Sequence, residues 1–372
     1  MQTKNTKKRV LLTGGHARST AYAVFQELKI RHADWELFWI GPKNVIEGEN
    51  VGSYDSEVFP KLGVHYYSTI TGRFQRKFTK WTIPSILKMP IGFVQTFFYV
   101  LSIRPNVTLS FGGFTAFPVV IASWVLNKPV VLHEQTSAVG RANLHSAFFA
   151  KKIALARSDS REFFPKTKCV VTGNPVSKEI LNIGLKKYIR KVPNIFITGG
   201  ASGSQTINNM VDKVLNKLLA SYSVSHQVGK LQFSYFKKKR ANLSAKYRRR
   251  YQVYSVIPSW DWYKFMDKAD IVVSRAGANI TSELMIAKRP ALLIPLPLSF
   301  MEEQKKNAVY AQNFGVAKII EQENLSPDLF LRKLKDMQNN WDKIVNSISA
   351  KKSPDTLASK RVVDIIESFI KP

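Results

Sequence analysis

The chain has 372 residues, a net charge of +30 and a single cysteine, Cys169. This length is too great for one ordinary domain and suits two, and 45% hydrophobic residues are enough to build full cores. One cysteine excludes a disulfide framework and a multi-cysteine metal site, and it favours a reducing compartment. The 56 Lys and Arg outnumber 26 Asp and Glu, which indicates a polyanionic partner such as nucleic acid, anionic lipid or a phosphate-bearing substrate.

Strand and helix signals alternate along the first half of the chain. Apolar and β-branched runs predict buried strands at 8–14, 35–41, 64–69, 107–113, 129–135, 151–156 and 168–173. Stretches between them predict helices at 17–31, 85–103 and 115–126. No apolar segment precedes the first strand, so we expect no signal peptide. The stretch 86–101 is shorter than the roughly 20 apolar residues of a membrane span and contains Lys88 and Pro90.

The same alternation restarts near residue 193. The pattern predicts strands at 193–200, 224–229, 251–257, 270–277 and 291–297, a helix at 204–219 and a last helix at 354–370. Repeated βα alternation is typical of parallel sheets covered by helices on both faces. We therefore expect an α/β protein of two Rossmann-like domains, with ligands bound beyond the carboxyl ends of the strands and in the cleft between the domains. The expected domains are 1–175 and 176–350, and 351–372 is expected to pack back on the first.

Four predicted strands run into glycine turns. They are LLTGGH (11–16), LSFGGF (109–114), FITGGASGS (196–204) and SRAG (274–277). Glycines at the carboxyl ends of parallel strands keep backbone amides accessible to phosphate oxygens. None of the turns is a Walker A loop or a full GxGxxG motif, which argues against an ATPase and against an NAD enzyme.

The segment TGRFQRKFTKWTIP (71–84) combines basic and aromatic residues. Its basic members include Arg73 and Lys77, and its aromatic members are Phe74, Phe78 and Trp81. Two interpretations stay open. Such a segment suits the interface of an anionic membrane, and it also suits an ordinary helix that buries its aromatics in a core.

A series of short motifs follows the order and intervals of one known family. The motifs are TGGH, FGGF…P, VVLHEQ…G…N, GNPV, TGGASG…N, HQVG, SRAGA…SE and PLP…Q…NA. They span roughly residues 8–320, and the series is specific although each motif alone is not. On these motifs the chain resembles the MurG family within glycosyltransferase family 28. These bacterial enzymes add N-acetylglucosamine to lipid I and so make lipid II for peptidoglycan.

The resemblance implies a GT-B fold, in which two Rossmann-like domains face each other across a cleft. It implies UDP-N-acetylglucosamine as donor, mainly in the C-terminal domain. The N-terminal domain would take the acceptor, a polyprenyl-diphosphate-linked muramoyl pentapeptide. The acceptor's 4-hydroxyl would attack with inversion, without a metal cofactor in the active site. The family is peripheral, on the cytoplasmic face of the cell membrane, and its apolar patch gives 71–84 a role on an anionic membrane surface. The oligomeric state stays open.

The resemblance also assigns roles to individual positions. The catalytic candidates are His16, as general base or phosphate ligand, and Glu134. The donor-binding residues are Gly199, Gly200, Ser202, Gly203, Ile257, Arg275, Gly277, Ala278, Glu283, Glu303 and Gln304, with Glu283 on the ribose hydroxyls. The acceptor-binding residues are Gly14, Gly15, Gly112, Gly113, His133, Gln135, Thr136 and Asn143. Asn174 and Ser177 are expected in the linker near the nucleotide, and His133 is also compatible with a structural role that anchors its loop.

The chain departs from the family pattern at several positions in these motifs. Thr136 stands where Asn is usual, Ser177 where Arg is usual, Ala201 where Ser is usual and Glu303 where Gln or His is usual. Loss of an Arg that meets phosphate costs about 1.5–3 kcal/mol of charge-assisted binding, which neighbouring Lys178 is placed to offset. These changes bear on donor and acceptor identity and leave the fold expectation intact.

Three other functions are compatible with parts of this pattern. A related transferase with another UDP-sugar donor or lipid acceptor would share the same motifs. A UDP-sugar 2-epimerase shares the two-domain fold but needs more acids and histidines than the acceptor side here offers. A nucleic-acid-binding protein would explain the charge, but the basic runs 236–240 and 247–251 lie in a polar helical region, which favours a solvated face.

Overall fold

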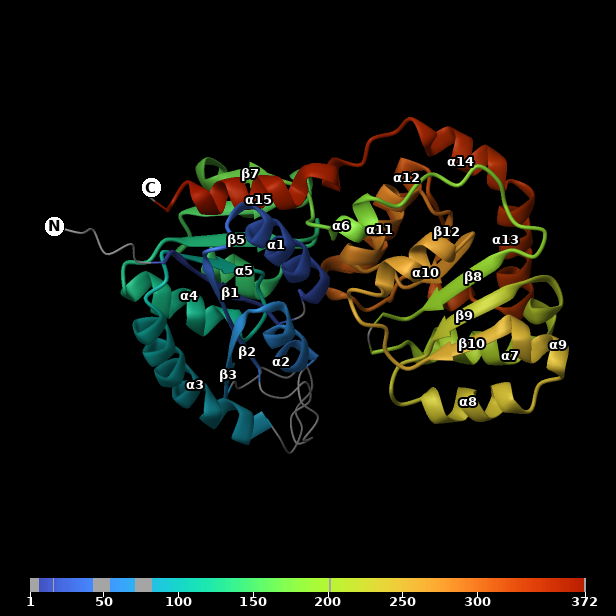
Figure 1. The fold of residues 1–372 in the computed structure, drawn as a ribbon, viewed down its shortest axis with the longest axis horizontal. Helices are drawn as coiled ribbons and strands as arrows, with labels where there is room; N and C mark the ends of the chain where they lie inside the picture. The colour runs from blue at the N-terminus through green and yellow to red at the C-terminus, as the bar shows by residue number, and fades with distance from the viewer. Residues whose placement is uncertain (1–6, 16, 43–53, 71–81, 201, 371–372) are drawn as a thin grey trace. The chain divides into compact units, whose positions relative to one another are not determined.

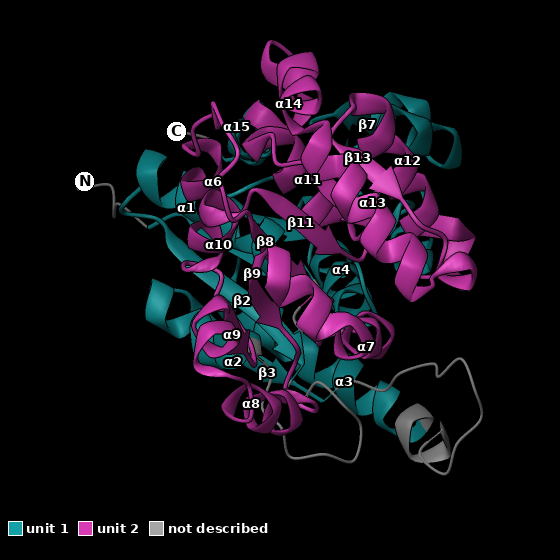
Figure 2. Ribbon diagram, turned by 90° about the vertical axis from the view of Figure 1, so that its right-hand side faces the viewer, with its two compact units in different colours: residues 1–177, 357–372 teal, residues 178–356 magenta. Residues whose placement is uncertain are grey.

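The computed structural model describes residues 7–15, 17–42, 54–70, 82–200 and 202–370. The chain divides into two compact units, residues 1–177 with 357–372 and residues 178–356 (Figure 2). The sequence predicts the first boundary after residue 175, and the structure has it after Ser177. The C-terminal residues belong to the first unit, so the chain returns to the unit in which it begins.

The first unit is built on a seven-stranded parallel sheet (Figure 1). Its strands are β1 (Arg9–Thr13), β2 (Glu36–Pro42), β3 (His65–Thr69), β4 (Val107–Ser110), β5 (Val130–Glu134), β6 (Lys152–Leu155) and β7 (Cys169–Val171). The order across the sheet is β3-β2-β1-β4-β5-β6-β7, so β1 and β4 lie side by side at the point where the order reverses. Strand residues Val10, Leu11 and Leu12 are fully buried, as expected for a sheet that is covered on both faces.

Helices flank this sheet. They are α1 (Arg18–Arg31), α2 (Tyr54–Val58), α3 (Thr82–Ile103), α4 (Ala116–Val125), α5 (Arg141–Ser146) and α15 (Ala358–Glu367). The predicted helices at 17–31, 85–103 and 115–126 correspond to α1, α3 and α4. Helix α15 lies against α1, where Arg31 forms salt bridges with Asp364 at 2.6 Å and with Glu367 at 3.2 Å. The buried face of α15 is mainly apolar and includes Val362, Val363 and Ile366.

The second unit contains a six-stranded parallel sheet. Its strands are β8 (Asn194–Thr198), β9 (Ser223–Gln227), β10 (Tyr251–Tyr254), β11 (Ile271–Ser274), β12 (Ala291–Leu293) and β13 (Ala317–Ile319), in the order β10-β9-β8-β11-β12-β13. This is the strand order of a Rossmann fold, which binds ligands where the order reverses, between β8 and β11. The helices are α6 (Lys178–Leu181), α7 (Gln205–Ser221), α8 (Phe233–Ala241), α9 (Ala245–Arg250), α10 (Trp262–Lys268), α11 (Ala278–Ala287), α12 (Glu303–Phe314), α13 (Pro327–Asn339) and α14 (Trp341–Ser349).

The predicted strands are confirmed, but several end earlier than the apolar pattern suggests. The strand predicted at 107–113 ends at Ser110, because Gly112 and Gly113 turn the chain with φ of 77° and 92°. The strand predicted at 270–277 ends at Ser274, and Gly277 already caps α11. The sequence analysis did not predict β13 or the helices α12 to α14.

No helix in the described part of the chain is both long enough and apolar enough to cross a membrane. The basic runs expected in a helical region fall on α8 and α9, and Lys237, Lys238, Arg248 and Arg249 are exposed there. This exposure confirms the solvated face that the sequence favoured.

Candidate functional site

The loop after β8 is a glycine loop that packs backbone against backbone. Gly200 and Gly203 have φ of 80° and 78°, in the left-handed region that favours glycine. A Cβ on Gly203 would collide with the carbonyl of Val228, and one on Gly229 would collide with the carbonyl of Ser202. The loop can therefore approach the chain after β9 only because these positions carry no side chain.

Ser204 ends this loop and caps α7. Its Oγ accepts hydrogen bonds from Ile207 N at 3.4 Å and from Arg275 Nε at 3.0 Å. The Arg275 guanidinium also donates to the carbonyls of Ile294 and Pro295, at 3.1 and 3.3 Å, and to Gln322 Oε1 at 2.7 Å. Burial lowers the pKa of Arg275 from its usual value. With its donors directed at these partners, Arg275 ties the ends of β11 and β12 to the glycine loop.

Gly277 and Ala278 form the start of α11, one strand away from the glycine loop. Gly277 has φ of −68°, and no side chain caps the helix there. A Cβ added to Gly277 would meet no atom of the described residues within 4 Å, so the structure shows open space beside it. The first-turn amides and the positive end of the helix dipole favour an anion at such a position.

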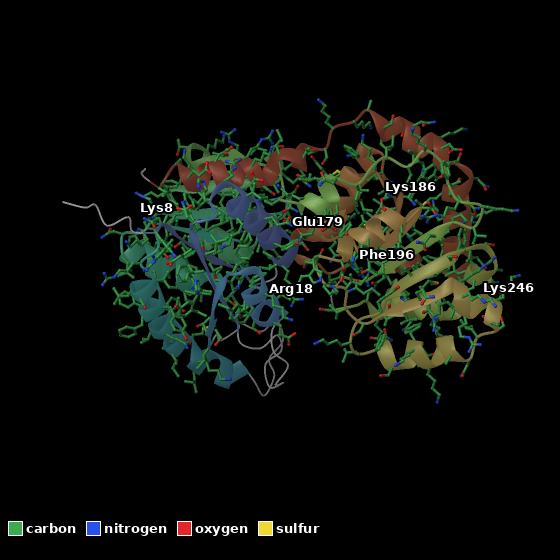
Figure 3. All side chains as sticks on the ribbon, viewed as in Figure 1. Lys8, Arg18, Glu179, Lys186, Phe196 and Lys246 are labelled. Atoms are coloured by element: carbon green, nitrogen blue, oxygen red, sulfur yellow. The ribbon has the colours of Figure 1, made fainter. Side chains whose placement is uncertain are left out.

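Glu283 lies in the second turn of the same helix and is 5% exposed. Its Oε2 accepts a hydrogen bond of 2.6 Å from Trp262 Nε1, at the start of α10. Burial raises the pKa of Glu283 to about 8, although the indole hydrogen bond opposes this shift. The ring of Trp262 packs edge-on at 5.1 Å against Phe196, a residue of β8 that is labelled in Figure 3. Trp262 could not be predicted from the sequence, because a lone aromatic in a helix pattern does not indicate its partner.

The remaining donor-binding candidates lie around the start of α12 and before α10. Gln304 Oε1 accepts from Leu296 N at 3.0 Å, and Ile257 is buried. Glu303 is the first residue of α12, and Met301 and Glu302 before it have positive φ of 50° and 54°. Two non-glycine residues in the left-handed region mark a sharp, costly turn, of a kind that clusters at functional sites.

Asn307 of α12 belongs to the PLP…Q…NA motif, which does not by itself predict a role for it. Its Nδ2 donates to the carbonyl of Ala276 at 3.2 Å. Asn307 thus joins α12 to the turn that precedes Gly277. Ala201, a predicted departure from the family pattern, lies outside the described residues.

In the first unit, the glycine turns after β1 and β4 touch each other. Gly15 N donates to the carbonyl of Gly112 at 3.0 Å, and Gly14 precedes it after β1. A Cβ on Gly113 would lie 2.9 Å from Gly15 Cα, and one on Gly112 would lie 2.7 Å from Asn143 Oδ1. The predicted acceptor glycines thus come together at the switch point of this sheet. His16 lies outside the described residues.

Glu134 organises the loop that follows β5. Its Oε1 accepts from Gln135 N at 3.0 Å and from Thr136 N at 3.4 Å. Its Oε2 accepts from Gly140 N at 3.1 Å and from Asn143 Nδ2 at 2.9 Å. A carboxylate that receives several hydrogen bonds is held in one orientation, and this fixes residues 134–143 as one unit.

The fold brings His133 beside the segment that leads into Asn174, although the two residues are far apart in the sequence. The buried His133 ring contacts the carbonyl of Gly173 through Nε2 at 3.1 Å, so that β5 is linked to the chain that enters Asn174. Asn174 is fully buried, and Ser177 is half-buried at the end of the first unit. The membrane candidates Arg73, Phe74, Lys77, Phe78 and Trp81 lie outside the described residues.

Comparisons with known proteins match both halves of the chain to glycosyltransferase domains. Residues 13–155 match the glycosyltransferase family 28 N-terminal domain, and residues 194–367 match the glycosyltransferase family 28 C-terminal domain. The chain is 30% identical to a Clostridium kluyveri protein named UDP-N-acetylglucosamine–N-acetylmuramyl-(pentapeptide) pyrophosphoryl-undecaprenol N-acetylglucosamine transferase, over 97% of this chain and 99% of that protein.

Two solved structures share the fold. The MurG crystal structure from Acinetobacter baumannii has a TM-score of 0.68 at 22% identity and covers 97% of this chain and 99% of its own. A structure from Listeria monocytogenes titled as a UDP-N-acetylglucosamine 2-epimerase has a TM-score of 0.67 at 13% identity, over 98% of this chain and 96% of its own. At these identities both comparisons speak to the fold alone.

Proposed function

Because the chain belongs to glycosyltransferase family 28, we propose that it transfers N-acetylglucosamine from UDP-N-acetylglucosamine to the 4-hydroxyl of the muramoyl sugar of lipid I. The observation that carries the proposal is the full-length match to a relative named for this transfer. The product is lipid II, the precursor of peptidoglycan. The epimerase alternative has less support, since its likeness lies in the fold at 13% identity.

The second unit would hold the donor. Gly199, Gly200, Ser202 and Gly203 would surround the diphosphate, since their loop presents backbone at the switch point of the sheet. The open space beside Gly277 and the amides of α11 would receive phosphate oxygens. Glu283 would accept hydrogen bonds from the ribose hydroxyls, with Ile257, Glu303 and Gln304 nearer the base and the sugar.

The chemistry is a displacement at the anomeric carbon of the donor sugar. The acceptor oxygen forms a bond to that carbon, the bond to the β-phosphate oxygen breaks, and UDP leaves with the electron pair. Amides and the dipole of α11 would stabilise the charge on the departing diphosphate. The hydroxyl proton passes to a general base, for which we propose His16. The contacts of Glu134 support a positioning role for this residue, and its catalytic role stays a prediction.

The first unit would hold the acceptor and meet the membrane that carries its polyprenyl tail. An apolar stripe on α3 supports this, formed by Leu87, Ile91, Val94, Phe98 and Leu101. These five side chains are between 41% and 68% exposed and recur every three or four residues, so they share one helix face. An exposed apolar surface of this kind marks an interaction site.

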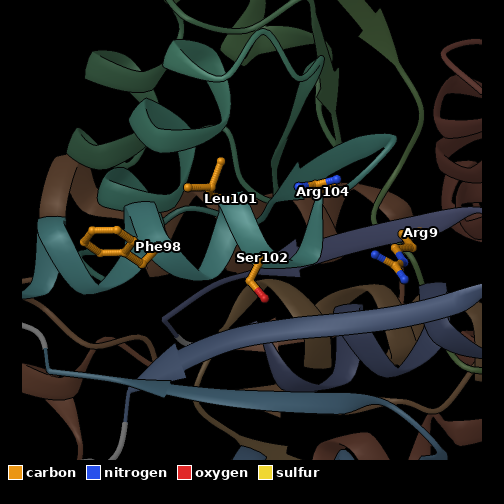
Figure 4. Close-up of a pocket in the computed structure, with 5 residues that line it drawn as sticks. All are labelled: Arg9, Phe98, Leu101, Ser102 and Arg104. Carbon is orange, nitrogen blue, oxygen red and sulfur yellow. The ribbon is translucent and has the colours of Figure 1, made fainter.

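Basic residues lie at one end of the stripe, and the first unit carries further exposed aromatic residues. At its end, Phe98 and Leu101 line an open hollow of about 460 Å³ together with Ser102, Arg9 and Arg104 (Figure 4). Exposed Trp124 and Phe148 each pack against Phe149, at 5.1 and 5.2 Å. Arginines beside exposed aromatics suit the headgroup region of an anionic membrane. We therefore propose peripheral attachment through this surface, with no spanning segment required.

Calorimetry tests the donor site. The wild type should bind UDP-N-acetylglucosamine in the presence of EDTA, and Glu283→Ala should bind it about ten-fold more weakly or worse, because hydrogen bonds to a carboxylate are lost. Lipid I supplied in detergent should then be converted to lipid II. A wild type that binds no UDP-sugar would refute the donor assignment. Binding that depends on a divalent ion would refute the metal-free site.

A further inference from the structure

Among the residues that the structure describes, one donor reaches the Glu283 carboxylate, the indole of Trp262. The distance of 2.6 Å from Nε1 to Oε2 is short for an N–H···O hydrogen bond. Within the described residues no salt bridge reaches Glu283, and its Oε1 forms no hydrogen bond. The indole therefore determines which way this carboxylate faces.

Trp262 is itself held in place. It is the first residue of α10, and its backbone N–H donates to the carbonyl of Pro258 at 3.1 Å. Its ring stands edge-on to Phe196, at 5.1 Å and 69°, and Phe196 is fully buried in β8. Helix α10 also packs beside α11. The indole of Trp262 thus belongs to a well-packed part of the fold and can fix the more flexible side chain of Glu283.

We propose that Trp262 is a positioning residue that holds Glu283 for the nucleotide: the indole fixes Oε2 and leaves Oε1 for a ribose hydroxyl. This inference rests on the proposed function, because that function makes the ribose the ligand of Glu283. A carboxylate whose rotamer is fixed before binding loses less conformational freedom when the ligand arrives. The indole also stabilises the ionised form, which accepts more strongly than the protonated form.

Trp262→Phe tests the proposal, because it keeps a ring against Phe196 and removes the N–H donor. Calorimetry with UDP and with 2′-deoxy-UDP should show two effects. UDP binding should weaken about ten-fold. The affinity difference between the two nucleotides should shrink, since a misplaced carboxylate gains less from the 2′-hydroxyl. Loss of packing alone would not change this difference.

Trp341→Phe is the matched control. Trp341 Nε1 donates to the carbonyl of Asp270 at 2.8 Å, so this variant also loses an indole hydrogen bond in the second unit. Its nucleotide affinities should equal those of the wild type. If Trp262→Phe binds UDP as well as the wild type, the inference is wrong. If it binds UDP more tightly, the indole competes with the ribose and the inference is also wrong.

A second measurement covers a variant that fails to fold. Glu283→Gln should move one indole ¹H–¹⁵N signal, that of Trp262, because an amide replaces the carboxylate as acceptor. Unmoved indole signals would overturn the contact itself. Failure of the proposed function gives a different pattern, since Glu283→Ala would then bind UDP like the wild type while the indole signal still moved in Glu283→Gln.

Discussion

His226 is a fully buried histidine whose hydrogen bonds determine its tautomer. Asn208 donates through Nδ2 to the carbonyl of Val228, so its Oδ1 accepts from His226 Nε2 at 3.0 Å. The Tyr251 hydroxyl lies 2.9 Å from His226 Nδ1 and donates to it. The ring is therefore neutral with its proton on Nε2, and burial lowers its pKa to about 3. This network fixes the chain just before Gly229, which supports the glycine loop.

The buried His226 predicts a pH dependence of stability. Its folded pKa of about 3 lies below the unfolded value near 6.5. Between these values the unfolded chain binds a proton that the folded chain does not, so the free energy of unfolding falls as the pH decreases. One proton corresponds to about 1.4 kcal/mol per pH unit. The free energy of unfolding, measured with urea between about pH 6 and pH 4, should depend less steeply on pH in His226→Gln than in the wild type. Equal slopes would contradict this assignment.

Two glycine substitutions should separate ligand binding from folding. Gly277→Ala adds a methyl to open space at an ordinary φ, so the free energy of unfolding should change by less than about 1 kcal/mol. The same methyl would occupy space proposed for the diphosphate, so UDP affinity should fall. Gly203→Ala should instead destabilise by about 1–3 kcal/mol, because its φ is 78° and its Cβ meets the carbonyl of Val228. Thermal unfolding and calorimetry on both variants decide between these outcomes.

At the scale of elements, helix α15 is joined to α1 by two kinds of contact. Arg31 bridges to Asp364, Glu367 and, within α1, to Glu27 at 2.8 Å, and it is 25% exposed. Ile366 lies on the buried face of α15 and is fully buried. Exposed ion pairs contribute about 0–1 kcal/mol each, whereas removal of a buried isoleucine side chain costs about 2–5 kcal/mol.

These magnitudes predict that apolar burial, and not charge, holds α15. Ile366→Ala should lower the free energy of unfolding by about 2–5 kcal/mol. Arg31→Met should lower it by about 1 kcal/mol. Denaturant titration of both variants measures the two losses. A larger loss for Arg31→Met would show that the ion pairs dominate.

The sequence predicts the elements better than it predicts their contacts. Apolar strand runs such as Val10–Leu12 follow from local composition, and so do the glycine turns, because their residues are contiguous. The hydrogen bond from Trp262 to Glu283 joins positions on two different helices, and no local pattern reports it. Likewise the guanidinium of Arg275 donates to Ser204 and Gln322, which are distant from it in the sequence, so no local pattern predicts these hydrogen bonds.

At the scale of the whole molecule, the positions of the exposed basic residues explain part of the net charge of +30. Arg9 and Arg104 lie beside the apolar stripe of the first unit, and further exposed basic residues lie on α8 and α9 of the second. Charges near a membrane act over roughly 8 Å at physiological ionic strength. Binding to anionic vesicles should therefore weaken as salt rises, while the apolar contribution of the stripe persists.

The apolar stripe predicts a specific loss of membrane binding. Ile91→Ser with Phe98→Ser removes two side chains that are 56% and 60% exposed, so stability should change little. Binding to vesicles that contain anionic lipid should fall at least several-fold, because the buried apolar area is lost. Leu231→Ser is the matched control, since Leu231 is 95% exposed in the second unit. Sedimentation with vesicles should separate the variants, with calorimetry of UDP binding unchanged in both. If the double variant sediments like the wild type, the stripe does not carry attachment.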